Sequence, residues 1–294
     1  MLNAFTVDVE DYFQVSAFEQ YVDRAHWPHF EGRVVDNTHR LLNLLERRQV
    51  RGTFFVLGWV ATRYPELVRT IHAAGHELAS HGYWHQLVYE QTPDEFRRDL
   101  KDARAAIAEA SGVETTMYRA PSFSITSASL WALDVLIEEG FTLDASVFPI
   151  RHDRYGLPDA CRTLHRVNSP AGASIWEFPA STVQLAGWNV PVGGGGYFRL
   201  YPWTLTRRLL SRFNREERQP FVFYTHPWEI DPAQPRIAGP GLRSQFRHYV
   251  NLASTAGKLE QLLDAFEFTT LGNLLNQATA ASLSPQASEA SCPA

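Results

Sequence analysis

The sequence predicts an α/β fold, a distorted (β/α) barrel, on two observations. Short apolar runs alternate along the chain with segments of helical periodicity, which is typical of parallel βα units. Polar residues stand directly after these runs, at positions that converge on one face of a parallel barrel: Asp8, His81, Arg119, Asp144 and His226. The 294 residues suffice for one large barrel or for two smaller domains.

Strands are expected in the first half of the chain at residues 4–8, 52–57, 77–80, 116–119 and 141–144. Helices are expected between them at 37–49, 65–74, 92–110 and 127–139. The helix at 92–110 has the clearest start, because Thr92 can cap it, Pro93 suits its first position and Glu95 can close a capping box. Glycines follow three of the helices: Gly75, Gly112 and Gly140.

The second half has a weaker pattern. Residues 149–196 are rich in Pro and Gly and predict loops and short strands, with a mobile turn at 193–196. Further on we expect a helix at 203–213, a buried strand at 220–226, a long helix at 242–266 and a strand at 268–271. Residues 279–294 are rich in Ala, Ser and Pro and predict a disordered tail, which leaves residues 1–278 as the folded domain.

Composition and charge restrict the class of protein. The net charge of −5 argues against a general binder of nucleic acids or membrane surfaces. No apolar run reaches 18 residues, and no basic segment precedes an apolar one at the N-terminus, so we expect neither a membrane span nor a signal peptide. With only Cys161 and Cys292, we expect a free thiol at Cys161. The expected location is cytoplasmic, with peripheral association with the inner membrane as an alternative.

Two histidines carry the most specific signal. His81 and His85 stand four residues apart, so on a helical turn their imidazoles project from one face and can bind one metal ion. An acidic cluster, residues 8–11, closes the first strand. One carboxylate and two histidines make a three-ligand zinc site with an open position. Such a pair on its own is more often two hydrogen-bonded histidines.

The chain resembles the polysaccharide deacetylase family, also called the NodB-homology or carbohydrate esterase family 4 domain. The resemblance covers residues 4 to about 270, with the middle the weakest, and rests on these motifs: Thr6-Val-Asp8, Thr53-Phe-Phe55, Gly75-His76-Glu77, His81 and His85, Arg119-Ala-Pro121, Asp144, and Phe223-Tyr-Thr-His226. Residues 8–11, 152–156, 194–198 and 225–229 resemble a branch encoded with exosortase and exopolysaccharide systems.

The first motif departs from the usual pair of adjacent aspartates, because this chain has Asp8-Val9-Glu10-Asp11. Residues two apart on a strand share a face, so Asp8 and Glu10 can both point inward. We therefore predict Asp8 as general base and Glu10 as the carboxylate ligand of the metal, with Asp11 as the alternative ligand. The altered motif is also compatible with an alternative, a related carbohydrate-binding protein that has no catalytic activity.

The resemblance implies a NodB-like barrel of about seven strands and roles for further residues. Arg119 would hold Asp8 ionised, and His226 would be the general acid, oriented by Asp144. A backbone N–H near residues 121–123 would stabilise the oxyanion. Contacts with the substrate are expected from Pro121, Phe123, Trp188, Tyr197 and Trp228, although core packing is an equally good interpretation of each aromatic ring.

The function expected is a metal-dependent N-deacetylase. It would bind Zn²⁺, or another divalent transition metal, and remove acetyl from N-acetylated amino sugars of an exopolysaccharide or a lipid-linked precursor. A deformylase or a small-amide hydrolase would use the same residues and is the first alternative. Glycoside hydrolysis by two carboxylates does not account for the histidine pair.

Overall fold

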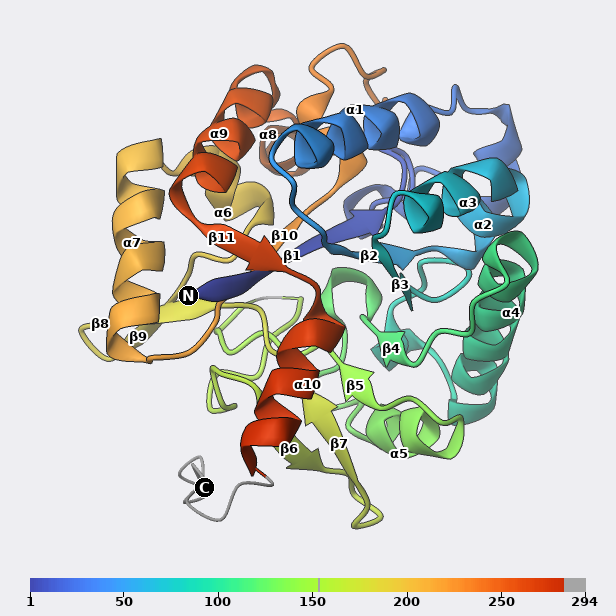
Figure 1. Cartoon of the computed structure of the whole chain (residues 1–294). Helices are drawn as coiled ribbons and strands as arrows, with labels where there is room; N and C mark the ends of the chain where they lie inside the picture. Colours follow the sequence, from blue (N-terminus) through green and yellow to red (C-terminus); the bar gives the residue numbers. More distant parts are fainter. Residues whose placement is uncertain (153, 283–294) are drawn as a thin grey trace.

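The computed structural model describes residues 1–152 and 154–282. Among these residues nine strands form one sheet, in which the order is β10-β1-β2-β3-β4-β5-β7-β6 and β11 also pairs with β1. All neighbours are parallel except β6 and β7. Helices surround the strands on the outside (Figure 1). The predicted α/β architecture is confirmed, with a sheet that is mixed at one end.

The strands are β1 Leu2–Val9, β2 Thr53–Val56, β3 Glu77–Ser80, β4 Met117–Tyr118, β5 Leu143–Asp144, β6 His165–Asn168, β7 Ser174–Glu177, β8 Thr182–Leu185, β9 Trp188–Pro191, β10 Val222–Thr225 and β11 Glu267–Thr269. The helices are α1 Val34–Arg47, α2 Gly58–Arg63, α3 Pro65–Ala73, α4 Pro93–Ser111, α5 Trp131–Glu138, α6 Gly195–Leu200, α7 Trp203–Glu216, α8 Leu242–Tyr249, α9 Leu252–Ala265 and α10 Leu271–Ser282. Strands β8 and β9 form a separate antiparallel hairpin.

Strand register aligns the ends of the central strands. Val9 of β1 pairs with Val56 of β2, which pairs with Ser80 of β3, and Ser80 pairs with Tyr118 of β4. The residues that follow these strands therefore stand level at one edge of the sheet. This edge is where Glu10, His81 and Arg119 leave their strands.

The core lies on both faces of the central strands. Seven of the eight residues of β1 and all four of β2 are buried, which is typical of parallel strands covered by helices. Helix α4 has the predicted capping box, in which Thr92 Oγ1 accepts from Glu95 N and Thr92 N donates to Glu95 Oε2. Packing on both faces fixes the positions of the strand ends that carry the site.

Two expectations about local structure are wrong, and one helix was not expected. The long helix at 242–266 is two helices, because Asn251 adopts a left-handed φ of 56° between α8 and α9. The glycines at 193–196 are no mobile turn, because Gly194 packs on the backbone of Tyr224 and Gly195 begins α6. A Cβ at Gly194 would lie 1.9 Å from the Tyr224 carbonyl oxygen. Helix α2, which precedes α3, was not predicted.

The predicted disordered tail is wrong for its first residues, because α10 continues to Ser282. Residues 283–294, Cys292 among them, lie outside the described residues. The expected free thiol at Cys161 is also wrong, since the described residues contain no free cysteine. In the described ranges, no helix is long and apolar enough to cross a membrane.

Candidate metal centre and active site

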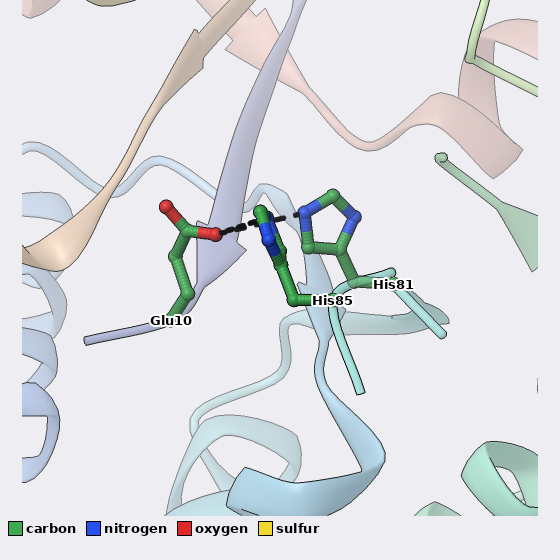
Figure 2. A group of neighbouring side chains, drawn as sticks. All are labelled: Glu10, His81 and His85. Carbon is green, nitrogen blue, oxygen red and sulfur yellow. Dashed lines mark ion pairs between the residues drawn. The ribbon is translucent and has the colours of Figure 1, made fainter. Parts of the chain in front are cut away.

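Three side chains converge where β1 and β3 end. Glu10 Oε2 lies 2.6 Å from His85 Nε2 and 4.0 Å from His81 Nε2. One ligand atom from each residue lies within 4.8 Å of the others, and all three residues are buried. Figure 2 shows the carboxylate and both rings pointing toward one another. Two imidazole nitrogens and one carboxylate oxygen are a donor set that suits a divalent metal ion.

The two histidines do not lie on a helical turn, contrary to the prediction. Residues 81–87 form a loop in which His85 has a left-handed φ of 51°. Asp99 of α4 fixes this loop, because its carboxylate accepts hydrogen bonds from Tyr83 N at 2.8 Å and Trp84 N at 3.1 Å. The loop brings the rings of His81 and His85 to 5.3 Å between centroids. Tertiary hydrogen bonds thus replace helical spacing as the cause of convergence.

The ring of His81 has a fixed orientation. Its Nδ1 lies 2.8 Å from the carbonyl oxygen of Arg119, and a carbonyl only accepts, so Nδ1 carries the proton. Nε2 therefore carries no proton, and its lone pair lies on the side of Glu10. Burial lowers the pKa of His81 to about 4, so the ring is neutral near pH 7. A neutral imidazole with its second nitrogen hydrogen-bonded is the form that binds metals.

Glu10 is ionised and one of its oxygens lacks a hydrogen bond. Burial by itself would raise the pKa of Glu10, but His85 and His226 lower it below its ordinary value. Oε1 accepts a hydrogen bond from Trp228 Nε1 at 3.0 Å. Oε2 is buried and makes no hydrogen bond among the described residues, although His85 Nε2 lies 2.6 Å away. A cation bound between this buried anionic oxygen and the imidazole nitrogens would offset the cost of burying its charge.

Asp11, the alternative ligand, points elsewhere. Its Oδ2 accepts hydrogen bonds from Arg33 N at 2.7 Å and Val34 N at 3.0 Å, at the start of α1. Its Oδ1 accepts from Tyr12 N. The carboxylate thus caps α1, and the structure groups Glu10 rather than Asp11 with the two histidines.

Asp8 and Arg119 form a buried ion pair beside this cluster. Arg119 Nη1 donates to Asp8 Oδ1 at 2.7 Å and to Thr6 Oγ1 at 2.8 Å. The guanidinium also lies 4.1 Å above the ring of Phe55. Asp8 Oδ2 is on the side of the site and lies 3.7 Å from His226 Nε2. The two side chains are therefore in contact, as expected, while the role of Asp8 as general base stays a prediction.

His226 has a different carboxylate partner from the one predicted. Its Nδ1 lies 2.5 Å from Glu229 Oε1, and Glu229 Oε2 accepts from Arg199 Nε at 2.9 Å. Burial alone would lower the pKa of His226, but Glu10, Glu229 and Asp8 raise it to about 9. Neither Glu229 nor Arg199 was predicted as a site residue. The sequence feature that could have identified Glu229 is Pro227, which favours a helical turn directly after β10. In the structure Pro227 starts a 3₁₀ helix, η5 Pro227–Ile230, and this turn places Glu229 next to His226.

Asp144 does not contact His226 in the structure. It stands directly opposite Glu177 in the pairing of β5 with β7, and the two buried carboxyl groups interact. Asp144 also accepts a hydrogen bond from Ser146 Oγ, and Glu177 accepts one from Val147 N at 3.0 Å. Burial raises the pKa of both acids, most strongly that of Glu177. The expected role for Asp144 fails because the neighbouring strand supplies its partner.

Comparisons with known proteins match two regions of the chain. Residues 24–136 match the polysaccharide deacetylase family model, and residues 145–276 match a domain of unknown function, DUF3473. A putative polysaccharide deacetylase, YheN of Bacillus subtilis, is 28% identical over 124 residues, which are 40% of this chain and 44% of that protein. A peptidoglycan-N-acetylglucosamine deacetylase of Bacillus cereus is 28% identical over 105 residues, 35% of this chain and 38% of that protein.

Residues 24–136 of this chain are thus similar to the polysaccharide deacetylases. The matches span less than half the length of either curated relative. The crystal structure of a putative polysaccharide deacetylase from Mycobacterium smegmatis has a similar fold, with a TM-score of 0.60 and 21% identity over 99% of this chain and 93% of that one.

The deacetylase-like region does not hold the whole site. Both histidines of the cluster and Arg119 lie in residues 24–136, whereas His226 and Glu229 lie in the region that matches DUF3473. Asp8 and Glu10 precede both regions. Because β10 pairs with β1, the second region brings His226 level with the end of β1.

A cavity of about 400 Å³ opens onto the cluster. Of the five residues expected to contact substrate, Phe123, Tyr197 and Trp228 line it, and Pro121 and Trp188 do not. Trp188 is 65% exposed and lies on β9, and Pro121 is buried. Trp228 stacks between the rings of His226 and His248, at centroid distances of 5.1 and 4.2 Å. Lining residues that were not predicted include Ser16, Tyr89, Arg154, Tyr155 and His248.

Proposed function

We propose that this chain is a metal-dependent N-deacetylase acting on N-acetylated amino sugars. The observation that carries the proposal is that Glu10, His81 and His85 converge in one cavity with Asp8 and His226. Conversion of an amide to an amine and acetate needs polarisation of the carbonyl, a base for water and an acid for the leaving nitrogen. The five side chains provide for all three requirements.

Glu10, His81 and His85 would hold the metal. The fit rests on Glu10 Oε2, which lies beside both histidines without a hydrogen bond, and on the neutral Nε2 of His81. Zn²⁺ is the ion we propose, and another divalent transition metal would suit the same nitrogen and oxygen donors. When bound, such an ion supplies Lewis acidity at the amide carbonyl.

Asp8 is the proposed general base. Arg119 donates to Oδ1 of its carboxylate, and Oδ2 lies on the side of His226, so Oδ2 can take the proton of the attacking water. The new bond joins the water oxygen to the carbonyl carbon. A backbone N–H of the segment Pro121–Phe123 would stabilise the resulting oxyanion, because Ser122 and Phe123 line the cavity.

His226 is the proposed general acid. Glu229 accepts from Nδ1, so the donated proton comes from Nε2, which faces Asp8 and Glu10. The carbon–nitrogen bond breaks as the nitrogen takes this proton, and acetate and a free amine leave. A binding module without catalysis has no need of the buried pairs Asp8–Arg119 and Glu229–Arg199.

The substrate class and location are further parts of the proposal. The branch resemblance favours an exopolysaccharide, or its lipid-linked precursor at the cytoplasmic face of the inner membrane. Residues 1–278 would act as one NodB-like domain, in which the region matching DUF3473 supplies the general acid.

Metal analysis combined with acetate release from N-acetylglucosamine oligomers tests this proposal. The wild type should bind about one divalent ion per chain and release acetate. Asp8→Asn should keep the metal and lose acetate release, whereas His81→Ala should lose both. Loss of metal from Asp8→Asn would make Asp8 a ligand instead of a base. Bound metal without acetate release from any N-acetylated sugar would overturn the deacetylase assignment.

A further inference from the structure

Helix α8 exposes two large apolar side chains on one face. Leu242 is 87% exposed and Phe246 is 60% exposed, and the four-residue spacing places them one above the other on the helix. Two further exposed apolar residues adjoin this region. Tyr21, 50% exposed, packs against Gly239 just before α8, and Leu200, 43% exposed, lines the cavity together with Arg247. Exposed apolar groups gathered at one place indicate an interaction surface.

The same segment is strongly basic, although the chain is acidic. Residues 232–259 contain four cations, Arg236, Arg243, Arg247 and Lys258, and no Asp or Glu. The acids at its two ends are already paired, Asp231 with Arg33 and Glu260 with Arg47. The three arginines are exposed. An apolar pair bordered by arginines is typical of a helix that lies in the interface of an anionic membrane.

This surface borders the opening of the active site. Ser244, Arg247 and His248 of α8 line the same cavity as Glu10 and His226. Arg199 fixes the end of the helix, because its guanidinium donates to the carbonyl oxygens of His248, Val250 and Arg247. A flat partner that contacts Leu242 and Phe246 would therefore lie next to the cavity mouth.

We propose that the α8 surface, defined as Leu242 and Phe246 with Arg236, Arg243 and Arg247, binds the interface of an anionic phospholipid bilayer. Leu242 and Phe246 would enter the acyl boundary, and the arginines would contact phosphate groups. A second copy fits less well, because a two-fold contact through this surface would bring arginines of both copies together. In that position the cavity receives an N-acetylated sugar carried on a lipid; this last step rests on the proposed function.

Vesicle co-sedimentation tests the surface independently of catalysis. Full-length protein is mixed with vesicles of phosphatidylcholine plus phosphatidylglycerol, or of phosphatidylcholine alone. We expect binding to the anionic vesicles that weakens with added salt, and little binding to the neutral ones. The double variant Leu242→Ser with Phe246→Ser should bind at least about tenfold more weakly, because two apolar side chains no longer enter the membrane. Trp188→Ser, which changes an exposed tryptophan on β9, is the matched control and should bind like the wild type.

Two results would overturn the inference. One is the absence of binding to anionic vesicles, or equal binding by the double variant. The other is a concentration-dependent dimer in light scattering that the double variant abolishes, which would assign the surface to a second copy. Acetate release from a water-soluble oligomer should be the same in the double variant and the wild type. If both release none while vesicle binding behaves as expected, the proposed function fails and the membrane surface stands.

Discussion

Glu229 accepts a hydrogen bond from His226 through a contact of 2.5 Å between Oε1 and Nδ1, and the two residues stand three apart around the turn that follows β10. The partner of the histidine therefore comes from its own loop and not from another strand. Arg199 holds Glu229 from the other side, at 2.9 Å. Glu229, together with Glu10 and Asp8, raises the pKa of the proposed general acid.

Replacing Glu229 should lower the pKa of His226. In metal-free wild type the pKa lies at about 9, against an ordinary value of 6.5, and Glu229 is one of three carboxylates that raise it. Glu229→Gln keeps an acceptor for Nδ1 and removes the charge, so we expect a shift toward 6.5 in an NMR titration of the imidazole. Acetate release should fall roughly 10²-fold, at the low end for loss of acid catalysis. Asp144→Asn is the control and should leave the titration of His226 unchanged.

The same pair gives a pH dependence of stability. Because the pKa of His226 is raised in the folded protein, its protonation stabilises the fold fully below about 6.5 and this contribution is lost as the pH rises through about 9. Urea unfolding of metal-free protein between pH 6 and 10 should show this loss. In Glu229→Gln the loss should be smaller and should occur at lower pH. A wild type and variant with the same pH profile would contradict this prediction.

Substitutions at Glu10 and Asp11 should have different effects, because Glu10 is the proposed metal ligand and Asp11 caps α1. Glu10→Gln should abolish tight metal binding, because it removes the only carboxylate of the cluster. Asp11→Ala should keep the metal and lower the free energy of unfolding by about 1–2 kcal/mol, because Arg33 N and Val34 N lose their acceptor. Metal content and urea unfolding measure the two effects. The opposite pattern would make Asp11 the ligand.

The buried pair Asp8–Arg119 should show strong coupling. Arg119→Met leaves Asp8 buried without its cation and should cost about 3–5 kcal/mol of stability. The double variant with Asp8→Asn should lose less than the sum of the two single losses, because no unpaired charge remains. Urea unfolding of the four proteins provides the cycle. Simple additivity would mean that the two side chains do not interact in solution.

Trp228 should support the metal centre, and Trp188 should not. Trp228→Phe removes the hydrogen bond to Glu10 Oε1 but keeps an aromatic ring between His226 and His248. We expect metal affinity to fall about 10–100-fold, as for other partners of metal ligands. Trp188→Phe should leave affinity unchanged. Competition with a chromophoric chelator measures both constants.

Much of the architecture could be predicted from local pattern. The strand at 77–80 and the helix starting at Pro93 have the predicted positions, since an apolar run and a capping box involve neighbours in sequence. The division of 242–266 into two helices could not be predicted in this way. It depends on the left-handed turn at Asn251, whose side-chain amide donates to the carbonyl oxygen of Arg199 in α6. Arg199 in turn donates to the carbonyl oxygen of His248 in α8. Both contacts join residues about fifty positions apart in the sequence.

By itself, the sequence determined that strands and helices alternate as in a parallel α/β fold. It also determined which acids and histidines follow the strands, because periodicity and short motifs are local properties. Only the tertiary structure decided that Glu10 joins the histidines while Asp11 caps α1, and that Glu229 bonds His226 while Asp144 pairs with Glu177. A carboxylate takes the partner that the folded backbone places beside it. Strand register and loop hydrogen bonds, which join residues far apart in sequence, make that choice.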